Sequence, residues 1–137
     1  MNLVDIGANL SHESFSDDLD EVVTSAQAAG ISHIIVTGTD QKSNEAALSL
    51  SQARPEIFSC TAGFHPHVAE SFDENALLCV RAFASADKCV AIGETGLDFN
   101  RKLSDPQTQL EVFEAHLKLA AELGKPLFLH QRDAHPE

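Results

Sequence analysis

Short apolar, β-branched runs alternate with amphipathic helical segments along the whole chain, and this alternation strongly limits how the chain can fold. Each run is short enough to be a strand buried on both faces, and the connections are short. The pattern predicts four βα units followed by a fifth strand, which together form a parallel sheet with right-handed crossovers. Periodicity leaves two architectures open: a complete five-stranded, doubly wound sheet, or the first five strands of an eight-stranded barrel.

The expected strands lie at residues 3–7, 34–38, 57–63, 88–94 and 126–130, and the expected helices at 16–30, 40–54, 73–85 and 105–124. We expect residues 65–72 to form a loop. The last helix has the clearest end signals, because Asp105 precedes Pro106 at its start and Gly124 follows it. Its buried stripe is expected to contain Leu110, Phe113, Leu117, Ala120 and Ala121.

The length of 137 residues fits a single domain, residues 1–137, and allows a buried core. The net charge of −12 opposes passive binding to nucleic acid or to an anionic membrane, because the summed field repels phosphates. A phosphate ligand would therefore need a local exception. Four of the nine basic residues provide it, since they lie in the segments just after predicted strands: Lys42, Arg101, Lys102 and Arg132.

The three cysteines, Cys60, Cys79 and Cys89, form no C-x-x-C motif and are odd in number. We read them as small buried side chains in a reducing compartment. The first residues resemble no signal peptide, and no stretch approaches the roughly 20 apolar residues that a spanning helix needs. The expectation is a cytoplasmic protein that does not bind membranes.

Chemically active side chains stand at the ends of three predicted strands. Glu94 ends one apolar run, His130 ends the next, and His65 follows an earlier strand. The carboxyl ends of parallel strands meet at one edge, so we expect these three side chains to converge. Carboxylate oxygen and imidazole nitrogen are ligands typical of a hydrolytic divalent-metal centre.

Three motifs occur in order with strand-like spacing: G-F-H-P-H at 63–67, A-I-G-E-T-G-L-D-F at 91–99 and L-H-Q-R-D-A at 129–134. Together with V-T-G-T at 36–39, they resemble the TatD-type metal-dependent deoxyribonucleases, a branch of the metal-dependent hydrolase superfamily. The resemblance implies a TIM barrel of roughly 250 residues or more. The chain would then be the N-terminal part of such a barrel, truncated after strand five.

The resemblance also implies roles for individual residues. Glu94 and His130 match two metal ligands of the family, for Mg²⁺ in the first place and for Mn²⁺ or Zn²⁺ as alternatives. His65 matches the histidine beside the substrate phosphate, and Arg132 is placed to clamp a phosphate oxygen. The family's next histidine and its late aspartate would lie beyond Glu137.

The sequence departs from the family at its first strand. Many members begin D-x-H-x-H and donate two histidines to a second metal, whereas this chain has Asp5-Ile6-Gly7-Ala8-Asn9. One sub-branch shares this loss. A single metal, or a weakly occupied second site, is therefore the expectation, and His12 could compensate.

Other polar residues near the motifs have structural interpretations. We expect His67 to face solvent from a rigid loop next to Pro66, and Asp98 to orient its neighbours through hydrogen bonds. His33 opens a strand and His116 lies in the middle of a helix among exposed residues, so both are expected to be structural or solvated.

The leading functional hypothesis is metal-dependent hydrolysis of DNA phosphodiester bonds from a 3′ end, with single strands as the preferred partner. Because half of the family's ligand set is missing, the complete protein, expected to be a monomer, should catalyse this reaction rather than these residues alone. An open barrel is expected to self-associate. The alternatives are a non-catalytic α/β fragment that binds a metal or a partner, and a metal-dependent hydrolase of a small phosphoester, lactone or amide.

Overall fold

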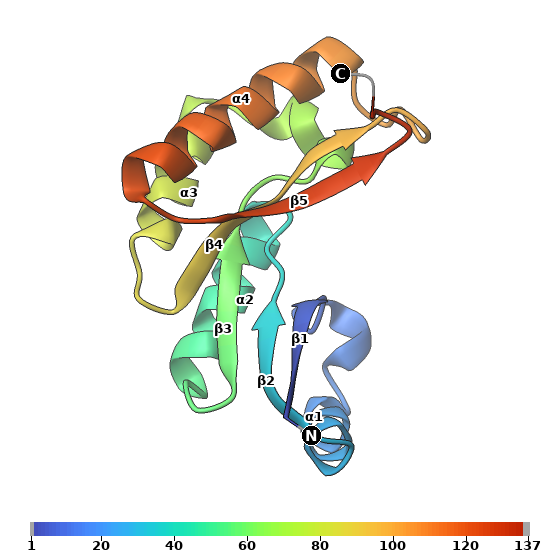
Figure 1. The fold of residues 1–137 in the computed structure, drawn as a ribbon, viewed down its shortest axis with the longest axis vertical. Helices are drawn as coiled ribbons and strands as arrows, with labels where there is room; N and C mark the ends of the chain where they lie inside the picture. Colours follow the sequence, from blue (N-terminus) through green and yellow to red (C-terminus); the bar gives the residue numbers. More distant parts are fainter. Residues whose placement is uncertain (1, 136–137) are drawn as a thin grey trace.

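The computed structural model describes residues 2–135 and shows an all-parallel sheet of five strands (Figure 1). The strands are β1 (Leu3–Ala8), β2 (Ile31–Val36), β3 (Phe58–Ala62), β4 (Cys89–Asp98) and β5 (Leu127–Arg132). They pair in the order in which they occur along the chain. A doubly wound sheet reverses its strand order, whereas a barrel adds every strand on the same side. The order therefore confirms the barrel-type prediction, as five consecutive strands of a (βα) barrel.

Helices cover one face of this sheet and enclose the core. They are α1 (Leu19–Ala28), α2 (Gln41–Ala53), α3 (Glu74–Ala84) and α4 (Pro106–Leu123), with two 3₁₀ helices, η1 (Glu13–Phe15) and η2 (Pro66–Ser71). Figure 1 shows α2, α3 and α4 on the same side of the strands. The buried strand residues Val36, Phe58 and Ile92 belong to the same apolar core as Val80 of α3 and Leu119 of α4.

Three of the four helices start at the expected position, each at an aspartate that caps the helix. Asp40 and Ser43 form a reciprocal capping box at the start of α2, and Asp73 accepts a hydrogen bond from the third backbone amide after it. Asp105 caps α4, and Gly124 ends it in a left-handed conformation at φ 64°. The fourth prediction is wrong, because α1 begins at Leu19 and not near residue 16. Ser16 instead closes the short turn of η1 by donating its hydroxyl to Glu13 O at 2.8 Å.

The predicted buried stripe of α4 is displaced by about one position from the observed one. Leu117 is 40 % exposed, and the buried residues are Gln109, Val112, His116, Leu119 and Ala120. The reason is that two polar side chains find fixed partners inside. Gln109 binds the backbone of Asp98 and Ser104, and His116 accepts a hydrogen bond from Phe64 N–H at 3.1 Å. The expectation that His116 lies among exposed residues is therefore also wrong.

Two further boundaries differ from expectation and shape the site. Residues 65–72 are not a plain loop, because Pro66–Ser71 forms η2. Strand β4 does not end at Glu94 but continues to Asp98, since residues 95–98 pair with residues 129–132 of β5. Glu94 is thus flanked along β4 by residues that pair with β5, Ile92 before it and residues 95–98 after it.

The outer strands are the most exposed elements of the sheet. All but the last residue of β1 are exposed, and apolar side chains such as Val4 and Ile6 remain 51 % and 61 % accessible. None of the helices within residues 2–135 combines the length and the apolar composition that crossing a bilayer requires.

Candidate metal centre

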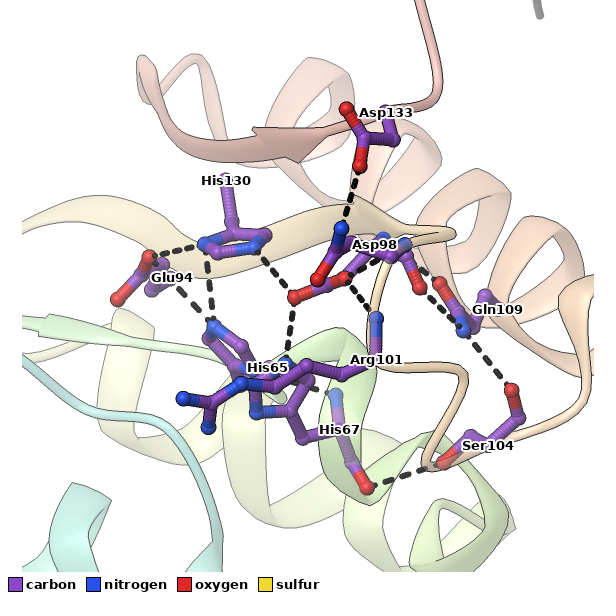
Figure 2. Close-up of polar contacts among 10 residues, drawn as sticks. His65, His67, Glu94, Asp98, Arg101, Ser104, Gln109, His130 and Asp133 are labelled. Carbon is purple, nitrogen blue, oxygen red and sulfur yellow. Dashed lines mark hydrogen bonds and ion pairs between the residues drawn. The ribbon is translucent and has the colours of Figure 1, made fainter.

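The side chains singled out at the strand ends converge in the folded chain (Figure 2). Glu94 lies within β4, His130 lies on β5, and His65 is the cap residue of η2 directly after β3. The lengthened β4 is essential to this convergence, because Gly96, two residues after Glu94, is the register partner of His130. The expectation that these three side chains meet at one edge of the sheet is confirmed.

The side chains of Glu94, His130 and His65 bring one oxygen and two nitrogen atoms close together. Glu94 Oε1 lies 3.1 Å from His130 Nδ1, His65 Nε2 lies 3.2 Å from the same nitrogen, and His65 Nε2 and Glu94 Oε1 are 3.7 Å apart. Two ligands held at right angles and about 2.1 Å from one divalent cation stand about 3.0 Å from each other. The Glu94–His130 separation fits two neighbouring ligands of one metal ion.

Asp98 determines which ring nitrogen of His130 is available to bind a metal ion. Its carboxylate is 1 % exposed, and Oδ2 lies 3.2 Å from His130 Nε2 and 2.6 Å from His67 Nε2. A buried carboxylate accepts hydrogen bonds, so both of these nitrogens carry a proton and donate it. His130 Nδ1 then presents its lone pair toward Glu94 Oε1. Two such acceptors at 3.1 Å repel each other unless a cation, a proton or a metal ion, lies between them.

The carboxylate of Asp98 is stabilised in its charged form. Burial alone would raise its pKa. The hydrogen bond from the backbone N–H of Arg101 and those from His67 and His130 outweigh burial and hold the pKa of Asp98 well below its ordinary value. Asp98 therefore stays ionised at neutral pH, as an acceptor for both imidazoles. Its expected orienting role agrees with this geometry.

His65 is oriented as a hydrogen-bond donor toward the same group. Its Nδ1 accepts from the backbone N–H of His67 at 3.1 Å, so in the neutral ring the proton resides on Nε2. Burial lowers the pKa of His65 to about 4, with further contributions from the neighbouring His130 and His67. At neutral pH the ring is uncharged and directs an N–H toward Glu94 and His130.

The expectation for His67 is wrong. The ring does not face solvent from a loop but donates through Nε2 to buried Asp98. One of its nitrogens lies within 4.8 Å of a ring nitrogen of His65 and of His130. These three imidazoles could by distance alone hold a metal. The bond from His67 Nε2 to Asp98 nevertheless occupies that nitrogen, so Glu94 and His130 are the better ligand pair.

The remaining candidates lie at the margins of the site. Arg132 is exposed at the end of β5, two residues after His130 and thus on the same face of the strand. His12 caps η1 by accepting from Ser14 N–H at 3.2 Å and does not join the imidazole group. Gly7 and Asn9, at which the sequence departs from the D-x-H-x-H pattern, line a cavity of about 340 Å³ together with His65 and Glu94.

The sequence analysis did not identify the residues that hold the backbone at Asp98 in place through hydrogen bonds. Buried Gln109 accepts from Asp98 N–H at 2.8 Å and donates to the carbonyl oxygens of Asp98 and Ser104, while the Ser104 hydroxyl donates to His67 O at 3.1 Å. A glutamine beside the apolar stripe of α4 was the available signal. Its partners lie 5 and 11 positions away, outside any helical spacing.

The fold and the site together define a class: a (βα)-barrel protein with its polar residues at the carboxyl ends of consecutive strands, as barrel enzymes have them. The sequence profile of the family described as "TatD related DNase" matches residues 4–137. The chain belongs to this family.

Individual relatives agree with this assignment. The chain is 45 % identical over 133 residues to a protein of Erwinia tasmaniensis named "3'-5' ssDNA/RNA exonuclease TatD", and 48 % identical to its namesake in Enterobacter lignolyticus. Each alignment covers 97 % of this chain and 51 % of the relative. A crystal structure of a TatD family hydrolase from Entamoeba histolytica superimposes with a TM-score of 0.89 at 29 % identity, covering 98 % of this chain and 51 % of that one. The chain thus spans about half the length of the relatives it matches.

Proposed function

We propose that the protein hydrolyses phosphodiester bonds of single-stranded DNA from the 3′ end in a metal-dependent reaction. The observation that carries this proposal is the Glu94–His130 pair, whose oxygen and nitrogen acceptors face each other at 3.1 Å. Support also comes from relatives that bear the name of a 3′-5′ single-strand exonuclease. Because the chain spans only half of their length, the activity of the whole protein is part of the proposal.

Glu94 and His130 would hold the divalent metal, with Mg²⁺ as the first choice and Mn²⁺ or Zn²⁺ as alternatives. When bound, such an ion polarises a phosphoryl oxygen and lowers the pKa of an attacking water. Asp98 keeps the Nδ1 lone pair of His130 available by accepting the proton of Nε2. The carboxylate of Glu94 supplies the negative charge that a neutral imidazole cannot.

His65 and Arg132 would position the phosphate. The N–H of His65 Nε2 is directed toward Glu94 and His130, where it can donate to a phosphate oxygen without bringing a charge of its own. Arg132 lies at the exposed end of β5 and offers a planar guanidinium that can bind two oxygens at once. Together they would fix the orientation of the phosphate relative to the metal.

Two finer aspects extend this proposal. We infer that the protein acts in the cytoplasm, since Cys60, Cys79 and Cys89 are all free thiols, which fits a reducing compartment. We also infer that the full-length protein is a monomer, whereas a chain with open sheet edges associates.

The test is release of a 3′ label from single-stranded DNA by the whole protein and by its Glu94→Gln variant, each with Mg²⁺, with Mn²⁺ and with EDTA. Glu94→Gln keeps the shape of the side chain but removes its charge. Glu114→Gln is the matched control, because Glu114 lies on α4 and pairs with Lys118. We expect metal-dependent release from wild type and control and none from Glu94→Gln.

Three outcomes would contradict the proposal. Equal activity of Glu94→Gln would exclude Glu94 as a ligand. Metal-dependent turnover of a lactone, an amide or a small phosphoester, without release of the label from DNA, would show that the protein is a hydrolase of small molecules and not a nuclease. If the whole protein binds Mn²⁺ and remains inactive on all substrates, it is a non-catalytic metal-binding protein.

A further inference from the structure

The basic side chains divide into two groups according to their partners. Within residues 2–135, five of them form an ion pair or bind a backbone carbonyl: Arg54, Arg81, Lys88, Lys118 and Lys125. The other four have no side-chain partner in that part of the chain: Lys42, Arg101, Lys102 and Arg132. The chain contains 21 acidic residues, so unpaired cations are not a consequence of a shortage of carboxylates.

All four unpaired cations lie at the same edge of the sheet. Lys42 is in the first turn of α2 after β2, Arg101 and Lys102 follow β4, and Arg132 ends β5. This is the carboxyl edge, which also carries Glu94 and His130. Cations without a side-chain partner among residues 2–135, at the edge of a strongly acidic chain, can bind an anionic ligand at little cost, because no ion pair within that part of the chain has to be broken.

The loop that carries Arg101 is fixed to the candidate metal centre. Asp98 Oδ1 accepts from Asn100 N–H at 3.1 Å and from Arg101 N–H at 3.0 Å, and Asn100 Nδ2 donates to Asp133 at 2.6 Å. In Figure 2 the side chain of Arg101 extends toward His65. Its positive charge is close enough to contribute to the lowered pKa of His65. The same carboxylate therefore holds His130 and places this cation.

A second depression lies on the other side of the site. The cavity bordered by His65 and Glu94 shares Asn9 and Thr39 with a neighbouring cavity of about 330 Å³, which Lys42 and His12 line. The hydroxyl of Thr37, in the wall of the first cavity, is buried without a hydrogen-bond partner in the described residues. Lys42 and the candidate metal centre thus border neighbouring cavities with two wall residues in common, and the cavity at Lys42 is also lined by Glu13 and Asp40.

We propose that Lys42, Arg101, Lys102 and Arg132 form a track that binds successive phosphates of single-stranded DNA on both sides of the metal centre. The site would then take an oligonucleotide rather than a mononucleotide or a small phosphoester. This inference rests on the proposed function for the position of cleavage. Binding of the strand to these cations does not require cleavage and can be measured without it.

The experiment measures binding of a fluorescein-labelled oligothymidylate of about 12 nucleotides to the chain by fluorescence anisotropy. EDTA is present throughout, so that hydrolysis cannot occur. The track variant is Lys42→Gln/Arg101→Gln/Lys102→Gln. The control is Arg81→Gln/Lys88→Gln/Lys118→Gln, which changes the net charge equally but removes only cations that already have partners. Salt is varied for each protein.

We expect the track variant to bind at least tenfold more weakly than wild type at low salt. Its slope of log affinity against log salt should fall by about 2, because each phosphate contact with a single strand contributes about 0.7. The control should keep the slope of the wild type. An equal loss of affinity in the track variant and in the control would overturn the track, because only net charge would then matter. Failure of the wild-type chain to bind the oligonucleotide would overturn it as well.

The two proposals fail separately. Intact, track-dependent binding without metal-dependent release of the 3′ label would refute the proposed function and leave the track standing. If the label is released but the track substitutions do not change the salt dependence of DNA binding, the track is refuted and the proposed function stands.

Discussion

Asp98 connects the parts of the site at the level of single residues. One of its oxygens accepts from His67 and His130, and the other accepts from the backbone N–H groups of Asn100 and Arg101. The same buried carboxylate thus selects the imidazole tautomer and fixes the loop after β4. Its effect on the metal is indirect, through His130.

Replacement of Asp98 by Asn should weaken metal binding about 10- to 100-fold. The amide keeps the size of the side chain but not the charge that holds the proton on His130 Nε2. Titration of the chain with Mn²⁺, followed by electron paramagnetic resonance, measures the affinity. Asp133→Asn is the control, because Asp133 is exposed and accepts a bond from Asn100. Unchanged affinity of Asp98→Asn would show that Asp98 does not act through His130.

Buried His116 should make the fold sensitive to acid. Burial lowers its pKa below the ordinary 6.5, although the hydrogen bond to Val112 O acts in the opposite direction. The unfolded chain therefore takes up the proton first. The stability that the neutral ring contributes is present above about pH 6.5 and is lost as the pH falls through the lower pKa of the folded state.

Urea unfolding of wild type and His116→Gln at several pH values from about 7.5 to 5 tests this prediction. The variant should be less stable at the upper end by about 1–3 kcal/mol, because Phe64 N–H loses its buried acceptor, and its free energy of unfolding should depend less on pH. His33→Gln, which removes a hydrogen bond to Ser59, is the control and should retain the wild-type slope. Parallel pH curves for wild type and His116→Gln would refute the role of His116.

At the level of elements, the site depends on a glycine within β4 that lets this strand continue beyond Glu94. Gly96 has a backbone φ of 143°, which residues with a side chain rarely adopt. A Cβ at this position would also collide with the backbone carbonyl of His130. This glycine permits β4 and β5 to pair beyond Glu94. A glycine that is typical of a loop in sequence is here part of a strand.

Gly96→Ala should therefore separate β5 from β4 and displace His130. We expect a loss of more than about 2 kcal/mol in the free energy of unfolding and loss of metal binding. Gly124→Ala is the matched control, because Gly124 also has a positive φ, 64°, but has no atom within 4 Å of the added methyl group. It should cost only about 1 kcal/mol and leave metal binding intact. Equal effects of both substitutions would show that the contact with His130 is unimportant.

At the level of the whole molecule, the exposed edge of the sheet sets the association behaviour. Leu3, Val4 and Ile6 of β1 are 42 %, 51 % and 61 % exposed, and Leu129 of β5 is 54 % exposed. Outer strands with apolar side chains and free backbone groups pair readily with other chains. The molecule therefore offers two edges at which a second copy can add.

The chain should associate as its concentration rises, and Val4→Lys/Ile6→Lys should reduce the association. Charged side chains on an edge strand oppose pairing with another chain. Sedimentation velocity at increasing protein concentrations measures the average mass. Leu78→Lys is the control, because Leu78 is 62 % exposed on α3, away from the sheet edges. A monomeric wild type at all concentrations would contradict the prediction.

Local sequence patterns were enough to predict the succession of strands and helices, the starts of three helices and the meeting of Glu94, His65 and His130 at one edge. These properties follow from local chemistry: β-branched runs, Asp at helix starts, and the rule that parallel strands end on the same side. The choice of a barrel over a doubly wound sheet came from the family resemblance, not from periodicity.

Three features follow only from contacts between distant parts of the chain: the continuation of β4 to Asp98, the inward position of His67, and the burial of Gln109 and His116. Each depends on a partner distant in sequence. His67 meets Asp98 31 positions away, and His116 meets Phe64 52 positions away. A polar side chain is buried only where such a partner compensates the loss of water, and local sequence patterns contain no information about that partner.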